Sequence, residues 1–287
     1  MKQLYYLVLR NCSLFRKNQK NVVLCFVAIL IVFGLYIIFL RDFMIQSVET
    51  SGLIRTSVHE FTDRLMLSGL LIVVNTTTCF GIMQLCIHDT EVGIRKDYLI
   101  APIRKMQLLF GYWITSIIVS FLYTCLAFFG VLIFCKVQYQ MSMNLLRCLQ
   151  CILLLFISSI LNSQLLLCII TFIKDTTTFS TFGNLYGMLV GFLAVTYLPY
   201  ELYPKWLKQV LIYYPPTHLT SFLRQCFVDG FEQTSGNGKK LCQYIYQIYG
   251  VRLIYKTQIC EGNQHILFLL VAFAILLLFL GIVHKES

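Results

Sequence analysis

Charged residues are scarce in this chain of 287 residues. They make up 13% of it, with 13 acidic side chains against 23 Lys and Arg, whereas soluble domains carry about 25%. Because 58% of the residues are hydrophobic, a soluble protein of this length would have no surface on which to place so much apolar area. The composition therefore excludes an ordinary soluble domain and predicts an integral membrane protein.

Motifs of catalysis are also missing. No GxxxxGK[ST] loop is present to hold ATP phosphates, and the nearest string, residues 236–240, lacks the spacing and the hydroxyl. The HExxH motif is absent and the five histidines are scattered. No pair of carboxylates lies within an apolar run, so intramembrane hydrolysis and an acidic proton relay have little support. We therefore expect no catalytic, cofactor-binding or metal site, and no enzyme activity in this chain.

Six apolar runs have about the length that a membrane span requires, roughly 20 residues. They cover residues 21–40, 65–87, 108–135, 145–173, 179–198 and 266–283. Only Lys174, Asp175 and three threonines separate the fourth run from the fifth, and without this break the count would be five. The predicted fold class is all-α: a polytopic membrane protein with six transmembrane helices, an N-terminal amphipathic helix and an external helical hairpin.

The first twenty residues contain five basic side chains and no acid. The positive-inside rule then places the N-terminus in the cytoplasm, and six spans return the C-terminus to the same side of the cell membrane. The net charge of +10 fits anchoring at anionic membrane lipid, and we expect no nucleic acid partner. The predicted units are an amphipathic helix (1–20), spans one to five with a charged cytoplasmic loop at 88–106 (21–198), an extracellular or re-entrant loop (199–264), and a sixth span with a short cytoplasmic tail (265–287).

Residues 4–17 have the periodicity of a helix that lies on a membrane face. At about 100° per residue, one side collects Leu4, Leu7, Val8, Cys12, Leu14 and Phe15, and the other Arg10, Ser13, Arg16 and Lys17. Asn11 is the exception within the apolar stripe. A solvated basic leader that never folds is the alternative.

The loop after the second run carries an acidic residue two positions before a glycine, a proline nine positions beyond that glycine, and another glycine nine further. These residues are Glu91, Gly93, Pro102 and Gly111. With this spacing the loop resembles that of the permease subunits of ABC-2 type exporters. The chain departs from the family pattern at Ile94, where a threonine is usual, so a hydroxyl cap is missing.

A second resemblance to the same family lies at the outer end of the fifth run. There a glycine-containing helix leads into a proline, an acidic residue, further prolines with a tryptophan, and an arginine. The residues concerned are Gly191, Pro199, Glu201, Pro204, Trp206, Pro215, Pro216 and Arg224. The two matches and the six-span plan cover most of the chain, but the family pattern does not explain the insertion at 229–263.

The resemblance implies that residues 91–99 form a coupling helix, which receives motion from a separate ATPase subunit and packs beside the N-terminal helix. Pro102 would end it or turn the chain into the next span. The residues expected to couple to the ATPase are Glu91, Gly93, Arg95, Lys96 and Pro102. ATP and Mg²⁺ would bind the partner. An ordinary basic loop held at lipid headgroups is the alternative.

Three glycines of the fifth run, Gly183, Gly187 and Gly191, lie four apart and therefore on one helix face. They predict either packing within the chain or a contact between two permease copies along the exit path. The polar residues Asn75, Thr78 and Asn184 either line that path or bond neighbouring helices. The residues of a predicted external gate are Pro199, Pro204, Trp206, Pro215 and Pro216. For these the alternative is an aromatic belt without a gate.

The resulting hypothesis is a membrane-spanning permease subunit of an ATP-driven ABC exporter. It would pair with a second copy as a homodimer, bind an ABC ATPase subunit, and move an amphiphilic compound, a peptide or a lipid-linked glycan outward. The alternative function is a non-transporting membrane interaction or immunity protein.

Most of the 12 cysteines lie in or beside apolar runs, where a thiol behaves as a small hydrophobe. Cys148 and Cys151 form a CxxC, but no second pair completes a zinc site. Cys226, Cys242 and Cys260 share one polar loop, so at least one of them is unpaired. We hypothesise a Cys242–Cys260 bridge. Trapping of free thiols in the intact protein should leave these two unmodified until a reductant is added, and their direct modification would contradict the bridge.

Overall fold

The structure is a computed structural model, and the ranges that it describes are 2–17, 23, 27, 30–49, 55–94, 105–141, 143–173, 175–228, 245–251, 254–255, 258–259, 268–275 and 277. Over these residues the chain is predominantly helical. Strands β1 (Ile254–Tyr255) and β2 (Gln258–Ile259) form an antiparallel pair of two residues each. The helices are α1 (Lys2–Lys17), the π-helix η1 (Tyr36–Leu40), α3 (Arg41–Glu49), α4 (Arg55–Glu91), α6 (Lys105–Tyr139), α7 (Leu145–Ile170), α8 (Thr176–Leu193), the 3₁₀-helix η2 (Tyr200–Leu202), α9 (Lys205–Leu211) and α10 (Pro215–Val228).

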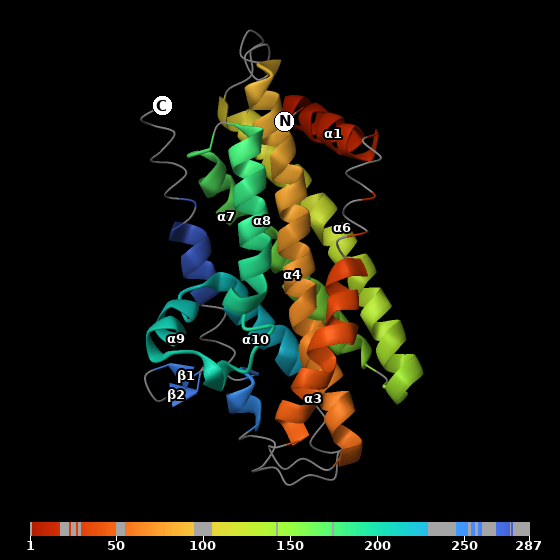
Figure 1. Ribbon diagram of the computed structural model, residues 1–287. Coiled ribbons are helices and arrows are strands. Elements are labelled where there is room, and N and C mark those ends of the chain that lie inside the picture. Colours follow the sequence, from red (N-terminus) through yellow and green to blue (C-terminus); the bar gives the residue numbers. More distant parts are fainter. Residues whose placement is uncertain are drawn as a thin grey trace.

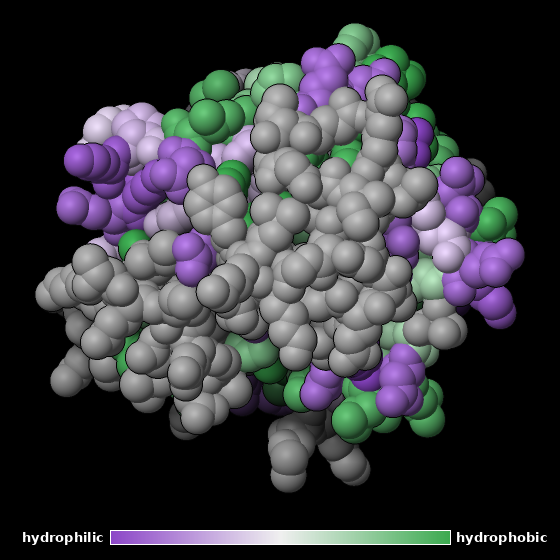
Figure 2. Space-filling model, turned by 90° about the horizontal axis from the view of Figure 1, so that it is seen from below, coloured by the Kyte–Doolittle hydropathy of each residue, from purple (hydrophilic) through white to green (hydrophobic). Residues whose placement is uncertain are grey.

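Helix α4 is the centre of the bundle. It packs against α3, α6, α7, α8 and α10. Helix α1 lies across one end of the bundle, beside α6, whereas α3, α9 and α10 gather at the opposite end (Figure 1). We refer to these as the α1 end and the α3 end. Seen from the α3 end, hydrophilic clusters alternate with hydrophobic side chains around the rim (Figure 2).

Three helices among the described residues are long and apolar enough to cross a membrane: Val58–Glu91, Met106–Tyr139 and Leu145–Ile170. At 1.5 Å per residue the first two are about 50 Å long, against a hydrocarbon core of about 30 Å, so each extends beyond the bilayer. The chain is thus a multi-pass membrane protein. The predicted first and sixth spans fall partly outside the described residues, and the total of six stays a prediction.

The break between the fourth and fifth apolar runs is confirmed. Helix α7 ends at Ile170, and Asp175 starts α8 by accepting a hydrogen bond from the Thr178 backbone N–H at 2.7 Å. Helix α8 ends at Leu193, earlier than the predicted 198, because Val195 adopts a left-handed φ of 57° and the chain turns. The ring of Tyr197 then folds back over α8.

Two helices of the predicted external segment begin at prolines, since Pro204 is the N-cap of α9 and Pro215 the first residue of α10. Almost all side chains of helix α10 are buried. It packs against α4 and α7. The placement of α9 and α10 as an external hairpin stays a prediction.

Arg224 explains why α10 is buried. Its side chain is 1% exposed and donates to three backbone oxygens, from Nη1 to Tyr249 at 2.8 Å, from Nε to Leu65 at 3.3 Å and from Nη2 to Thr196 at 3.4 Å. Thr196 follows the end of α8, where free helical carbonyls favour a cation. The arginine therefore joins α4 and the segments at 196 and 249 to α10.

A buried carboxylate, Asp63 of α4, organises the α3 end. Its two oxygens accept from Nε of Arg41 at 3.0 Å and Nη2 of Arg41 at 3.1 Å. The hydroxyls of Tyr36 and Tyr139 also donate to it. The Asp63 side chain is fully buried, whereas that of Arg41 is 26% exposed. One charge thus ties η1, α3 and α6 to the central helix.

The π-helix η1 makes this convergence possible. The Arg41 N–H bonds to the Tyr36 carbonyl five residues earlier. This wider turn brings the side chains of Tyr36 and Arg41, five positions apart, onto the same face, where an α-helix would separate them. Tyr36 and Arg41 therefore both reach Asp63.

Replacing Asp63 by Asn should destabilise the bundle by about 2–4 kcal/mol, because Arg41 would keep its charge in a partly buried site without an acidic partner. Thermal unfolding in detergent would measure the loss. Asp42→Asn is the matched control, since Asp42 is the adjacent exposed acid and should change little. Equal effects of the two variants would contradict the role of Asp63.

The loop cysteines are only partly described. Cys226 forms no disulfide with a described residue, and it packs against the main buried cluster. Cys242 and Cys260 lie outside the described residues, so their bridge stays a prediction.

Candidate functional site

The end of α4 is longer than the sequence predicted. Residues 88–91, expected in a charged loop, continue α4 to Glu91 without a break. The helix persists because Asp89 and Glu91 find partners on other helices. It stops when Gly93 adopts φ 87°, with its N–H bonded to the Thr90 carbonyl at 3.3 Å. Gly93 thus supplies a left-handed turn that other residues adopt with strain.

Asp89 fastens the N-terminal helix to the end of α4. One of its oxygens, Oδ2, accepts from Arg10 Nη1 at 2.6 Å and from the Tyr112 hydroxyl of α6 at 2.6 Å. The Asp89 side chain is 3% exposed. His88 approaches its other oxygen at 3.8 Å. A buried carboxylate with a cation and a hydroxyl donor is satisfied in this way, so α1 is held by a charge as well as by apolar contact.

The predicted amphipathic helix is present as α1, and it packs on α6. Its buried face is Leu7, Asn11 and Phe15, four residues apart. Asn11, the exception in the apolar stripe, is buried where α1 passes Gly111. A Cβ at Gly111 would lie 3.2 Å from the Leu7 Cβ. Gly111 therefore permits the close approach of α1 to α6.

Glu91 connects the same end of α4 to α8. Its Oε2 accepts from the Thr176 backbone N–H at 3.1 Å, in the first turn of α8. Asp175 caps that turn through Thr178, and this hydrogen bond lowers the pKa of Asp175 below its ordinary value. Two carboxylates therefore meet the positive end of the α8 dipole. Deeper in the bundle, Gln84 of α4 donates to the Ser180 hydroxyl at 3.1 Å.

A cavity of about 900 Å³ lies between these elements. Basic residues of α1, the end of α4 and hydroxyl groups of the first turns of α8 surround it. Its lining is Arg10, Leu14, Lys17, Gln84, Leu85, His88, Asp89, Ile94, Thr176, Thr177, Ser180, Thr181 and Asn184. Such a lining can bind polar groups. In the part of the chain that the structure describes, no cluster of three His, Cys, Asp or Glu could hold a metal ion.

Of the five predicted coupling residues, the structure places Glu91 and Gly93 together at the end of α4. Arg95, Lys96 and Pro102 lie outside the described residues, so a coupling helix over 91–99 stays a prediction. Glu91 itself belongs to α4.

The predicted path residue Asn75 lies in the bundle core. Its side-chain nitrogen donates to Ser159 Oγ at 2.7 Å and to Thr124 Oγ1 at 3.1 Å, and its oxygen accepts from Asn162 at 2.8 Å. Thr78 is also buried and bonds its own helix. These are the bonds between and within helices that the alternative predicts. Whether either residue lines a path stays a prediction.

The glycine face of α8 is turned toward the rest of this chain. A Cβ at Gly183 would lie 2.0 Å from the Phe80 ring, and one at Gly187 would lie 4.0 Å from Thr77, both on α4. A Cβ at Gly191 would lie 2.0 Å from the ring of Tyr197. These contacts lie within the chain, and a contact between two copies along an exit path stays a prediction. Asn184 is exposed on another face and lines the cavity.

The five residues of the predicted gate divide by burial. Pro199, Pro215 and Pro216 are buried, whereas Pro204 and Trp206 are exposed, with Trp206 at 67%. Pro204 and Trp206 belong to the start of α9 and the two adjacent prolines to the start of α10, and both helices lie at the α3 end (Figure 1). Whether these residues form a gate stays a prediction.

Sequence reasoning did not single out Asp63 or Asp89, and it placed Arg10 only on a polar face. A signal was present: acids are rare here, and an acid next to an apolar run needs a partner. The partner could not be named, because Arg10 and Arg41 are 79 and 22 residues away from their acids.

Comparison with known families gives a match over most of the chain. Residues 45–283 match the model of a family described as ABC-2 family transporter protein. No curated protein and no solved structure matches the chain.

Breaking the Arg10–Asp89 pair should release α1 from the bundle. We expect Asp89→Asn and Arg10→Gln each to raise amide hydrogen exchange in α1, and the double variant to add little to either, because both remove one interaction. Arg16→Gln is the control, since Arg16 is exposed on the same helix. Additive effects, or an equal effect of the control, would contradict the pairing.

Proposed function

Because the chain belongs to the ABC-2 family of transporter proteins, we propose that it is the permease subunit of an ATP-driven exporter and that a separate ATPase subunit drives it. Membership makes it a membrane permease component of ABC transport. The direction of transport, the ATPase partner and the cargo belong to this proposal.

The observation that carries the proposal is the double attachment at the end of α4. Asp89 and Glu91, two residues apart, bind α1 through Arg10 and α8 through Thr176. A force applied to the short segment after Gly93 would therefore move three helices together. Helix α4 carries that motion inward, since it packs against α6, α7, α8 and α10. This is what a permease without its own ATP site requires.

Movement of α8 against α4 would change the cavity between them. That cavity opens beside Asn184 and the hydroxyls of α8, so we place cargo entry there. Its polar lining, next to apolar helix faces, suits the head of an amphiphile, as in a lipid-linked glycan or an amphiphilic compound.

We also propose that two copies pair in the membrane. Large apolar side chains of α6, α7 and α8 are exposed on this single chain, among them Ile133, Leu145 and Met188. A second copy or lipid must cover them. The aromatic side chains at the α3 end, including Trp206, would lie at the outer interface and frame the exit.

Affinity purification of the tagged protein in mild detergent, followed by mass spectrometry, tests the partner. A roughly equimolar soluble ATPase with a phosphate-binding loop is the expected result. Recovery of the chain alone, or with other membrane proteins only, would favour a non-transporting interaction protein.

The coupling role predicts a specific loss. Glu91→Gln weakens the acceptor for Thr176, and Gly93→Ala strains the left-handed turn by about 1–2 kcal/mol. Each should lower stimulation of the ATPase by the reconstituted permease about tenfold, the factor that corresponds to about 1.4 kcal/mol of coupling. Glu201→Gln, an exposed acid at the α3 end, is the control. Unchanged stimulation in both variants would refute coupling through this site.

A further inference from the structure

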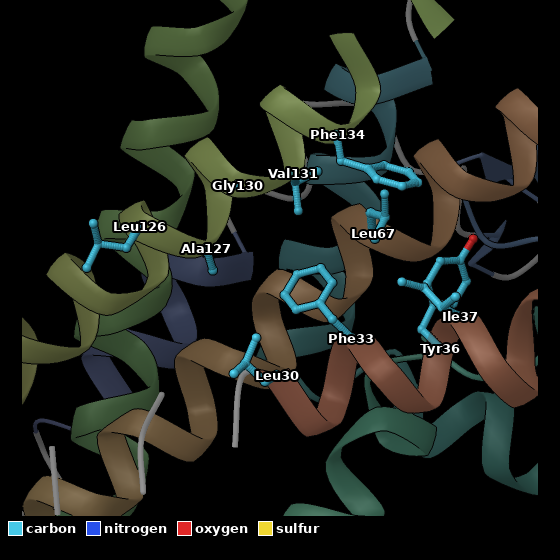
Figure 3. Close-up of a pocket in the computed structure, with 10 residues that line it drawn as sticks. All are labelled: Leu30, Phe33, Tyr36, Ile37, Leu67, Leu126, Ala127, Gly130, Val131 and Phe134. Atoms are coloured by element: carbon cyan, nitrogen blue, oxygen red, sulfur yellow. The ribbon is translucent and has the colours of Figure 1, made fainter. Parts of the chain in front are cut away.

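A second cavity lies on the side of the bundle, away from the α1 end. Its volume is about 310 Å³, and it lies between the helical segment 30–40, which ends in η1, and helices α4 and α6 (Figure 3). The ten lining residues are Leu30, Phe33, Tyr36, Ile37, Leu67, Leu126, Ala127, Gly130, Val131 and Phe134. We call it the side crevice.

The side crevice offers almost no hydrogen-bonding group. Only the Tyr36 hydroxyl is polar among the lining side chains, and it already donates to Asp63. A water molecule needs two or more polar partners to be held. The crevice therefore does not stabilise a water molecule, whereas its apolar lining can pack against a hydrocarbon chain.

The shape of the side crevice favours a linear chain. On α6 the lining runs from Leu126 to Phe134, a separation of eight positions, which is about 12 Å at 1.5 Å per residue. On the helical segment 30–40 it runs from Leu30 to Ile37, which is about 10 Å on the same rise. Leu30, Ile37 and Leu126 are each more than half exposed, so the crevice opens to the side of the bundle. Its walls follow the bundle axis, parallel to lipid chains.

A cation stands at the α3 end of the side crevice. Arg41 lies one turn beyond Ile37, and its side chain is 26% exposed. Its Nε and Nη2 bind Asp63 and Tyr139, while Nη1 makes no hydrogen bond to any described residue. A guanidinium fixed by a carboxylate, with an N–H group left over, can bind phosphate.

We propose that the side crevice binds one acyl chain of a membrane phospholipid whose phosphate contacts Arg41. Apolar contact alone would not retain the lipid, because bulk lipid tails are as apolar as the crevice. The phosphate contact and the fit of the chain distinguish this site from bulk lipid. The proposal does not depend on transport, so it can fail while the proposed function stands.

Two glycines provide a matched test. A Cβ at Gly130 or at Gly34 would meet no atom within 4 Å, but only Gly130 lines the side crevice. Gly130→Phe should fill the crevice, whereas Gly34→Phe adds the same ring to the helical segment 30–40 outside the crevice. Because the new ring could still disturb folding, Gly130→Val provides a smaller filling residue, and monodisperse elution of each variant is checked first.

The full-length protein is reconstituted in vesicles of phosphatidylethanolamine and phosphatidylglycerol that contain a phospholipid with a diazirine in its acyl chain. After illumination, peptides that contain residues 30–40 or belong to α6 are examined by mass spectrometry. We expect cross-links at 126–134 in the wild type and in Gly34→Phe, and their loss in Gly130→Phe and Gly130→Val. Absent cross-links in the wild type, or equal cross-linking in all variants, would overturn the proposal. The proposal would also be overturned if a different amphiphile, retained from cells, occupied the crevice and blocked the labelling.

Discussion

Three acidic side chains of α4 depend on partners from other helices. Asp63 needs Arg41 and two tyrosines, Asp89 needs Arg10 and Tyr112, and Glu91 meets the start of α8. An uncompensated buried carboxylate costs several kcal/mol. These contacts fix where α1, α3 and α8 sit relative to α4.

Between the two charged ends, neutral polar groups set the rotation of the helices. Asn75 of α4 is bonded to Thr124 of α6 and to Ser159 and Asn162 of α7. Apolar side chains alone would permit many rotations in lipid, where burial of hydrocarbon provides little driving force. The hydrogen bonds between these amide and hydroxyl groups select one rotation of each helix. The glycine face of α8 adds close contact with Phe80 on the remaining side of α4.

Much of the helical plan could be predicted from the apolar runs, the proline positions and the break at Asp175. The partners of charged residues could not, because periodicity within one helix contains no information on which distant residue faces it. Asn11 illustrates the limit: its stripe predicted an apolar neighbour, but its burial depends on Gly111 a hundred residues later. The continuation of α4 through Asp89 was missed for the same reason. The family resemblance was confirmed over residues 45–283, whereas the roles of Arg95, Lys96 and Pro102 stay predictions.

Arg224 constrains the order in which the helices of the bundle can assemble. Its guanidinium draws on carbonyl oxygens at positions 65, 196 and 249, and a chain is synthesised from the N-terminus. The Leu65 carbonyl is therefore available early, while the arginine and the Tyr249 carbonyl arrive in the last quarter of synthesis. Helices α4, α6 and α7 must associate first through their own contacts. The docking of α10 then becomes a final assembly step, at which the unfinished bundle is open to a membrane chaperone or a protease.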